Sequence, residues 1–168
     1  TLSNNKSFFN CNNKNVTIKQ DLVNNGVPGS YIFGTNLTTF SGATQNISGT
    51  SVTNFYDLNV SPSLSLTVNN SFTVNRNLTI GSGNLLLNAN KVTVLSSGSF
   101  YNNGAYTDDN VTGGVSMSGT SQQQISGTGS FNRLEINNTS GVLLLNDITL
   151  NNDLVLTSGI FKIQSYNL

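Results

Sequence analysis

The chain repeats itself, and this internal repetition limits the folds that are open to it. The stretch from Ser118 to Gly159 reproduces the pattern of residues 41–83. Ile47 recurs as Ile125 at an offset of 78 (125 − 47), and the later landmarks recur at an offset of 76 (for example 134 − 58). These later pairs are Leu58 with Leu134, Phe72 with Ile148, Leu78 with Leu154, and Gly83 with Gly159. Self-similarity at a fixed period is the signature of a repeat architecture.

A shorter period lies inside the long one. Leu58-Asn-Val60 recurs as Leu78-Thr-Ile80 at an offset of 20 (78 − 58), with apolar residues on either side of a polar one. Such alternation places one side of a strand in a core and the other in water. In the first copy it predicts the strands Leu58–Val60, Leu64–Val68, Phe72–Val74, Leu78–Ile80, Leu85–Leu87 and Val92–Val94.

Short strands at this spacing, with no helical segment between them, predict an all-β fold. We expect a right-handed parallel β-helix, or β-solenoid, whose coils of about 20 residues are grouped in a super-repeat of 76–78 residues. The right-handed sense follows from the preference of crossovers between parallel strands. The less regular stretch Phe100–Ile125 predicts one or two longer coils with protruding loops, among them Thr107–Asn110.

The expected organisation is one continuous solenoid domain. Residues 1–15 form a lead-in that belongs to a preceding coil, residues 16–91 form the first copy, and residues 92–168 form a truncated second copy. The second copy stops at Leu168, which aligns with Val92 (168 − 92 = 76). Solenoids hide their open edges under atypical end repeats, and neither end of this sequence has such a pattern, so we expect further copies in the natural protein.

The apolar side of the predicted strands defines an expected core. Its expected members, together with their second-copy partners, are Leu58, Val60, Leu66, Phe72, Val74, Leu78, Ile80, Leu87, Val92 and Val94. Pairs of asparagines follow several strands, as at Asn69-Asn70, Asn137-Asn138 and Asn151-Asn152. Asparagine suits sharp bends, and stacked coils would let these amides bond from one coil to the next.

Charge is nearly absent from the chain. Seven basic and seven acidic residues cancel, and charged residues make up 8% of the total, against about 25% in an average soluble protein. This balance offers no electrostatic footprint for nucleic acid or an anionic membrane surface. No apolar run is long enough to span a bilayer, so we expect neither nucleic-acid partners nor membrane insertion.

The residue types needed for common catalytic sites are missing or scattered. The chain has no histidine, which excludes Ser/His/Asp and Cys/His nucleophile pairs and histidine metal sites. Asp21 and Asp153 recur at one repeat position, which indicates a turn residue rather than half of a carboxylate pair. We therefore expect no enzymatic activity, no catalytic residues, no cofactor and no metal site.

Two smaller features each have a plainer interpretation. Cys11 is the only cysteine, so no internal disulfide can form, and a small buried residue is the favoured interpretation over a reactive thiol. Asp108-Asp109-Asn110 has oxygen ligands of the kind that Ca²⁺ takes, but no complete calcium motif surrounds it, so a solvated loop tip is favoured.

Two binding functions remain open as alternatives. A carbohydrate-binding solenoid would show exposed aromatic residues in a row, whereas the five tyrosines do not share one repeat position. An ice-binding solenoid would show regular threonine rows, whereas the outward residues of aligned strands are mixed. These outward residues are Asn59, Ser65, Thr73, Thr79, Thr93, Glu135, Thr149 and Val155.

Residues 40–163 resemble the repeat of large Bacteroidota cell-surface proteins. The shared pattern is a G-x-x-x-Q-x-I-S-G-T segment, then F-x-x-L-x-I-N-N, then G-V-x-L, a short V-T-V strand and L-x-L-x-S-G, and the second copy carries its first half in SGTSQQQISGTGSFNRLEINNTSGVLLL. The first copy departs from it at Ser61-Pro-Ser63, where the second has Asn137–Gly141.

The resemblance implies a parallel β-solenoid in a very long protein that is exported by the type IX secretion system, similar to gliding-motility adhesins. We therefore expect a non-enzymatic stalk segment of an extracellular cell-surface adhesin, working in surface attachment or gliding. Its expected partners are further repeats of the same chain, and surface glycans or the secretion and motility machinery.

Overall fold

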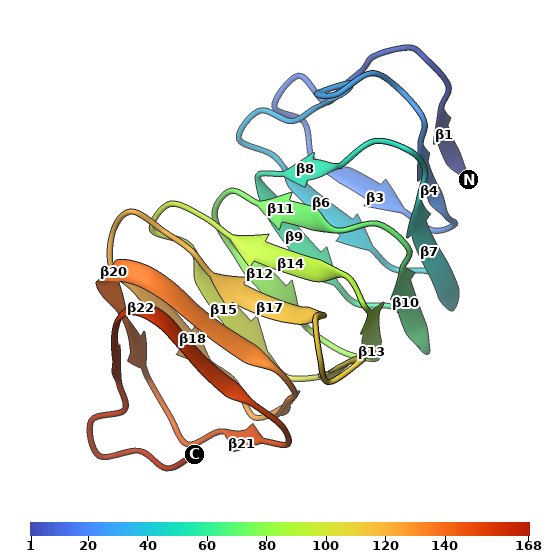
Figure 1. Cartoon of the computed structure of the whole chain (residues 1–168). Helices are drawn as coiled ribbons and strands as arrows, with labels where there is room; N and C mark the ends of the chain where they lie inside the picture. The colour runs from blue at the N-terminus through green and yellow to red at the C-terminus, as the bar shows by residue number, and fades with distance from the viewer.

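The computed structural model describes all residues from Thr1 to Leu168 and shows a β-solenoid without helices (Figure 1). The chain winds through eight coils, because one of its sheets holds eight strands and each of them belongs to a separate coil. Every strand pairing is parallel, as those of β9 with β12 and of β20 with β22 illustrate. The predicted all-β, parallel solenoid is confirmed.

Each coil has three faces, and the first strand of every coil builds the first face. Its strands, in stacking order, are β1 (Leu2–Asn4), β4 (Leu22–Asn24), β7 (Thr44–Ser48), β10 (Ser65–Val68), β13 (Asn84–Asn88), β16 (Ala105–Asp108), β19 (Ser130–Phe131) and β21 (Thr149–Leu150).

The second face starts with an isolated pair of strands and continues as a longer ladder. Its strands are β2 (Phe9–Asn10), β5 (Tyr31–Ile32), β8 (Asn54–Phe55), β11 (Phe72–Val74), β14 (Lys91–Val94), β17 (Gly114–Met117), and the first parts of β20 (Leu134–Leu144) and β22 (Leu154–Lys162).

The third face completes each coil. Its strands are β3 (Val16–Ile18), β6 (Leu37–Phe40), β9 (Asp57–Val60), β12 (Leu78–Ile80), β15 (Ser99–Asn102), β18 (Gln123–Ser126), and the last parts of β20 and β22. Because β20 and β22 run around the corner between two faces, the second and third faces join into one sheet at the C-terminal end.

The register of the ladders confirms the short sequence period. Leu58 of β9 pairs with Leu78 of β12, a step of 20 along the sequence (78 − 58). The step varies around this value, from 19 between Leu66 and Leu85 (85 − 66) to 25 between Phe100 and Ile125 (125 − 100). A longer coil therefore lies in the irregular stretch, as predicted. A step of 25 also separates Leu22 from Ile47 (47 − 22), near the N-terminal end.

The long sequence repeat does not contain a whole number of coils. The equivalent glutamines Gln45 and Gln123 lie in β7 and β18, which are eleven strands apart (18 − 7). Since a coil holds three strands, one copy fills three and two-thirds coils. Leu58 therefore lies on the third face, and its equivalent Leu134 lies on the second.

The boundaries of the expected lead-in and of the two repeat copies do not coincide with the boundaries of the coils. Residues 1–15 contain β1 and β2, which lie on the first and second faces of the first coil. β3 completes this coil on the third face. The first copy then begins at β3, on the third face, and the second begins at β14, on the second face.

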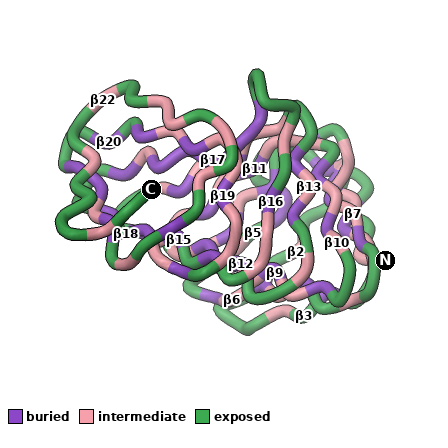
Figure 2. The backbone as a smooth tube through the Cα atoms, turned by 90° about the horizontal axis from the view of Figure 1, so that it is seen from below, coloured by how far each residue is buried: buried purple, intermediate pink, exposed green.

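The core is a continuous column of stacked side chains. All ten residues named above for the core are buried, whereas two of their second-copy equivalents, Leu156 and Ile163, are exposed because they lie on the last coil. Figure 2 shows buried segments recurring along the coils.

Aromatic rings contact one another along the core. The ring centroid of Tyr31 lies 5.5 Å from those of Phe9 and Phe55, and the centroid of Phe55 lies 5.4 Å from that of Phe72. Burial of apolar side chains from water is the main stabilising term for such a column.

The corners explain why the chain is so rich in asparagine. Asn77 Oδ1 accepts from the backbone N–H of Ser99, and Asn25 Oδ1 accepts from that of Thr50, in each case one coil further along. Asn70 Nδ2 donates to the carbonyl oxygens of the preceding coil at Gly49 and Ser51. These bonds satisfy backbone groups where the strand ladder is interrupted, since such groups are costly to leave without a partner. The predicted coil-to-coil bonding of the asparagines is confirmed.

Candidate functional site

The C-terminal coil presents core side chains to solvent. In register, Leu154 and Leu156 of β22 stack on Leu134 and Ile136 of β20. Ile136 is 0% exposed, whereas Leu156 is 65% exposed. The same column position is therefore buried inside the stack and open on its last coil, because no further coil of this chain covers it.

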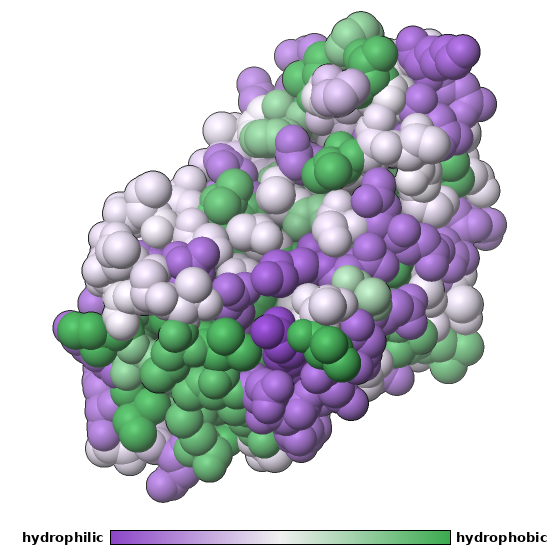
Figure 3. Space-filling model, viewed as in Figure 1, coloured by the Kyte–Doolittle hydropathy of each residue, from purple (hydrophilic) through white to green (hydrophobic).

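Apolar side chains gather over this end of the molecule. Figure 3 shows a broad hydrophobic patch over the lower-left region that holds the last coils in Figure 1. The exposed large apolar residues of the C-terminal part are Leu145, Leu156, Ile160, Ile163 and Leu168. An exposed apolar patch of this kind is typical of an interaction surface.

The open end of the N-terminal coil contains a hollow. A cavity of about 240 Å³ is lined by Thr1, Leu2, Phe9 and the segment 16–20. Leu2, Phe9 and Val16 are half-buried and pack against the main core. The floor of this hollow is the open top of the first coil, so both ends of the solenoid expose the apolar interior.

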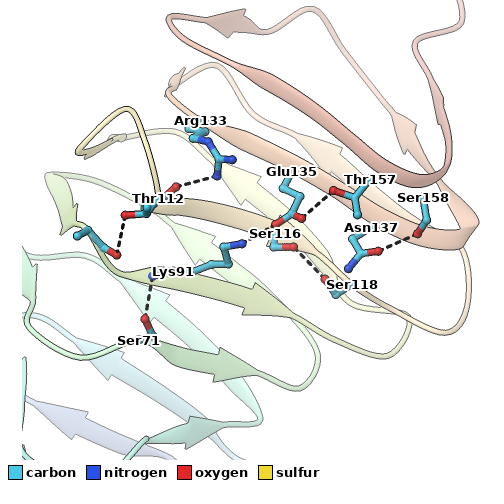
Figure 4. A network of polar contacts seen from close by, with 12 residues as sticks. Ser71, Lys91, Thr112, Ser116, Ser118, Arg133, Glu135, Asn137, Thr157 and Ser158 are labelled. Carbon is cyan, nitrogen blue, oxygen red and sulfur yellow. Dashed lines mark hydrogen bonds and ion pairs between the residues drawn. The ribbon is translucent and has the colours of Figure 1, made fainter.

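The side of the second face carries a polar network that crosses several coils (Figure 4). Lys91 Nζ of β14 lies 2.8 Å from Glu135 Oε2 of β20, across the intervening strand β17. Ser116 on β17 lies beside Glu135 in register. Thr157 on β22 donates to the other carboxylate oxygen of Glu135 at 2.8 Å.

The electrostatics of this network favour the ionised carboxylate. Burial on its own would raise the pKa of Glu135, but hydrogen bonds from Lys91, Thr157 and Ser116 outweigh it and lower the pKa. One carboxylate thus links strands of four successive coils. The arrangement is that of a stabilising clamp, because both of its oxygens are already engaged.

A second ion pair lies where the third face begins. Two guanidinium nitrogens of Arg76 bind the carboxylate of Asp57. Nε donates to Oδ1 at 2.9 Å, and Nη2 donates to Oδ2. The same carboxylate accepts from the backbone N–H of Asn77 at 2.9 Å, and the guanidinium lies over the ring of Tyr56 at 4.8 Å. The bond to Asp57 raises the pKa of Arg76.

The repeated aspartates also bond to backbone or to solvent rather than to one another. Asp21 Oδ1 accepts from the N–H of Asn46 at 2.8 Å, on the next coil. Asp153 is exposed, and its backbone carbonyl accepts from the N–H of Leu134 at 2.9 Å. The bond from Asp21 to the next coil is in keeping with the interpretation of this repeat position as a turn residue.

The side-chain oxygens of the Asp108–Asn110 loop already accept hydrogen bonds, from nearby residues for Asp109 and from later coils for Asp108 and Asn110. Asp109 accepts from the backbone N–H groups of Val111, Thr112 and Gly113, and from the Thr112 hydroxyl. These bonds, led by that of Gly113, hold the pKa of Asp109 well below its usual range. The chain contains no cluster of three or more His, Cys, Asp or Glu side chains that could hold a metal ion.

Cys11 lies in the core and not at a reactive site. It is buried beside Tyr31 and Asn36, and this burial raises the pKa of its thiol. A raised pKa leaves less of the nucleophilic thiolate. The structure therefore favours the plainer interpretation of this residue.

The outward-facing side chains of the third face are relevant to the carbohydrate-binding and ice-binding alternatives. Tyr101 is 42% exposed, but Tyr31 and Tyr106 are buried in the core, so the tyrosines form no exposed aromatic row. Three threonines are mixed with three other residues along the outward row of this face. Its paired members, in stacking order, are Thr17, Thr39, Asn59, Thr79, Tyr101 and Ser126.

The sequence indicated that neither end carries a capping repeat, but it did not reveal which apolar side chains the last coil exposes. Leu154-Val-Leu156 has the same pattern as the buried strands, and only its place on the last coil leaves Leu156 open. The pattern of a strand cannot indicate whether another coil will cover it.

The structure contains no helix, and hence none that is long and apolar enough to cross a membrane. Comparisons of the chain with models of protein families, with curated proteins and with solved structures find no match.

Proposed function

We propose that this protein is a non-enzymatic stalk segment of a long, secreted cell-surface adhesin. Its work is mechanical: a rigid solenoid holds a distal binding region away from the cell. The observation that carries the proposal is the unbroken stack of eight coils, whose parallel ladders repeat one coil-to-coil contact along the whole chain. The same contact can add further repeats at either end, where Leu156 and the hollow around Phe9 offer apolar coil surfaces.

The sides of the solenoid support the same function. Ion pairs and hydrogen bonds there are satisfied between coils, as for Glu135 and Asp57. Every buried side-chain nitrogen and oxygen has a hydrogen-bond partner. Because these polar groups are already paired with one another, few of them are free to bind or react with a ligand, which suits a spacer. Extracellular location, export by type IX secretion and a role in gliding or attachment rest on the sequence resemblance.

Scattering in solution tests the rod. A stack of eight coils at about 4.8 Å per coil is about 40 Å long. Proteins that carry one, two or three additional copies of the repeat should gain about 18 Å per copy, since each copy adds three and two-thirds coils. Small-angle X-ray scattering measures this increment, and a radius that grows without linear extension would rule out the stalk.

A carbohydrate-binding module is the second candidate function. Its specific support is Tyr101, an exposed ring set between Thr79 and Ser126 on the third face. A glycan array probed with this protein and with a Tyr101→Ala variant distinguishes the two functions. Binding that disappears in the variant would favour the carbohydrate module, and no binding by either protein would favour the stalk.

A further inference from the structure

Two equivalent corners of the solenoid carry the dipeptide Asn-Gly. Asn25-Gly26 and Asn103-Gly104 lie 78 residues apart (103 − 25), at the same position of the repeat. In such a dipeptide the backbone nitrogen of the glycine can attack the side-chain carbonyl carbon of the asparagine, and the missing Cβ of glycine leaves that approach open. Both corners therefore contain the atoms needed for loss of the asparagine side-chain amide as ammonia, which is deamidation.

We propose that Asn103 is a site of self-catalysed deamidation in the folded protein, and that Asn25 is not. This modification goes beyond the proposed stalk function and does not depend on it. The difference between the two corners lies in the groups that surround the reacting atoms.

The attacking nitrogen is held in the same way at both corners. The N–H of Gly104 donates to Oδ1 of Asn102 at 3.1 Å. The N–H of Gly26 donates to Oδ1 of Asn24 at 3.4 Å. Both of these accepting asparagines are buried. They fix the direction of the N–H bond that must lose its proton, and they do not distinguish the corners.

The side-chain oxygen of Asn103 has two hydrogen-bond donors. Thr128, on a later coil, donates to Asn103 Oδ1 from its backbone N–H at 3.1 Å and from its hydroxyl at 3.3 Å. Negative charge develops on this oxygen when the glycine nitrogen attacks, and donors that already point at it stabilise that charge. Asn25 Oδ1 accepts from the N–H of Thr50 at 3.1 Å and from no hydroxyl. The Asn103 corner therefore stabilises the reaction intermediate better.

The nitrogen that leaves also has a partner at Asn103. Its Nδ2 donates to the hydroxyl oxygen of Tyr101, an exposed residue. As the carbonyl carbon becomes tetrahedral, this nitrogen gains a free electron pair and takes a proton from the phenol, so that it leaves as ammonia. Val23 occupies the equivalent position at the other corner (101 − 23 = 78), and its side chain has no proton to give.

Access for water differs in the same direction. Asn103 is exposed and Gly104 is half-buried, whereas Asn25 is half-buried and Gly26 is buried. The second half of the reaction is a hydrolysis, so the more accessible corner is favoured again.

The reaction balances with water as its only co-reactant. The nitrogen of Gly104 loses its proton to solvent and bonds to Cγ of Asn103, and the bond from Cγ to Nδ2 breaks with release of ammonia. Tyr101 supplies one proton to the leaving nitrogen and regains one from solvent. Water then opens the five-membered imide at either carbonyl, which leaves an aspartate or an isoaspartate at position 103. No group is oxidised or reduced.

Peptide mapping by mass spectrometry measures conversion at both corners in the same sample. In the folded protein at neutral pH we expect Asn103 to convert at least about tenfold faster than Asn25, because positioned acids and donors of this kind contribute that much or more. In concentrated urea the two dipeptides should convert at similar rates, because only the folded chain brings Thr128 to Asn103.

Two side-chain deletions test the assigned roles. Tyr101→Phe removes the proton donor, and Thr128→Val removes the hydroxyl from the side-chain oxygen; both residues are exposed. Each change should slow conversion of Asn103 severalfold and leave that of Asn25 unchanged. Thr107→Val, at another exposed threonine, is the matched control and should alter neither rate. Circular dichroism checks that every variant is folded.

Three outcomes would overturn the proposal. Equal rates at the two corners of the folded protein would remove the selectivity. Absence of conversion at Asn103 in the folded protein, while the chain in urea reacts there, would mean that the fold protects this corner. Fast conversion that neither Tyr101→Phe nor Thr128→Val slows would mean that exposure alone controls the reaction. None of these results affects the stalk, which the scattering increments test separately.

Discussion

At the scale of single residues, two buried glutamines hold the corners of the solenoid. Gln45 Oε1 accepts from the N–H of Gly42, and its Nε2 donates to the carbonyl oxygen of Ile18 at 2.9 Å. Gln123 makes the equivalent bonds to Gly119 at 2.8 Å and to Val94 at 3.0 Å. Both glutamines are fully buried. The glutamine of the repeat pattern is therefore a structural residue, which replaces backbone partners where the ladder turns.

A glycine that follows each glutamine is required for a separate reason. Gly127 has a φ of +119°, and a Cβ at this position would collide with the backbone of Asn102 in the preceding coil. Gly49 has the same relation to Asn24. Coils approach so closely at this corner that no other residue fits, which accounts for the S-G-T part of the repeat.

Replacing Gln123 with leucine tests the role of the buried amide. Leucine fills a similar volume but leaves the N–H of Gly119 and the carbonyl of Val94 without partners, so the free energy of unfolding should fall by about 2–4 kcal/mol. Gln124→Leu is the matched control, because this neighbouring side chain is exposed and should change stability by less than about 0.5 kcal/mol. Urea unfolding measures both, and equal effects would contradict the assignment.

At the scale of the strand, alternation decides which side chains enter the core. Leu144 at the end of β20 is buried, while its neighbour Leu143 points outward and is half-buried. Leu144 stacks on Ile125 of β18 in register. Each strand depends on the strands of the coils before and after it, because no strand buries its apolar side alone.

Introducing a charge at this position should break the stack. Leu144→Asp would leave an unpaired carboxylate in an apolar column, and we expect a loss of at least about 4 kcal/mol or unfolding of the C-terminal coils. Leu143→Asp, one residue away on the outer side, should cost about 1 kcal/mol or less. Hydrogen exchange would locate the damage; protection that survives in β18–β22 of the Leu144→Asp variant would argue against the column.

At the scale of the whole molecule, stability comes from stacking and not from net charge. The formal charge is zero, and only two ion pairs join side chains: Arg76 with Asp57 and Lys91 with Glu135. Surface ion pairs contribute little in water. The groups whose pKa the fold shifts titrate at acidic or basic pH and not near neutrality. The free energy of unfolding should therefore vary with pH in these two ranges.

The melting temperature should be nearly constant between about pH 5 and pH 8, because the chain has no histidine. The lowered pKa of Glu135 gives stability that is present above the unfolded value of about 4.3 and is lost as the pH falls through the folded value. Burial raises the pKa of Cys11, Tyr31 and Tyr106. Their contribution is therefore present below the unfolded values of about 8.5 for cysteine and about 10 for tyrosine, and decreases as the pH rises beyond them. Calorimetry from acid to alkaline pH measures the profile, and a sharp maximum near neutrality would contradict it.

The sequence by itself determined the solenoid, its coil length and the inward side of each strand. These follow from local rules: a period of two along a strand and of about 20 between strands leaves parallel stacking as the way to bury every apolar residue. The expected strands around Phe72 and Leu78 match β11 and β12 to the residue. Leu64, expected at the start of a strand, lies outside β10 and is exposed, since the chain is still turning there after Pro62.

Only the tertiary structure decided how the two repeat copies fall on the faces of the coils and which side chains the last coil exposes. All three faces share one alternating pattern, so the sequence cannot show that a copy spans eleven strands and that Leu58 and Leu134 lie on different faces. That shift depends on where the corners bend, which is set by contacts between coils such as those of Gln45 and Gln123. The exposure of Leu156 likewise depends on what lies over it, and a local pattern contains no information about a neighbour that is distant in sequence.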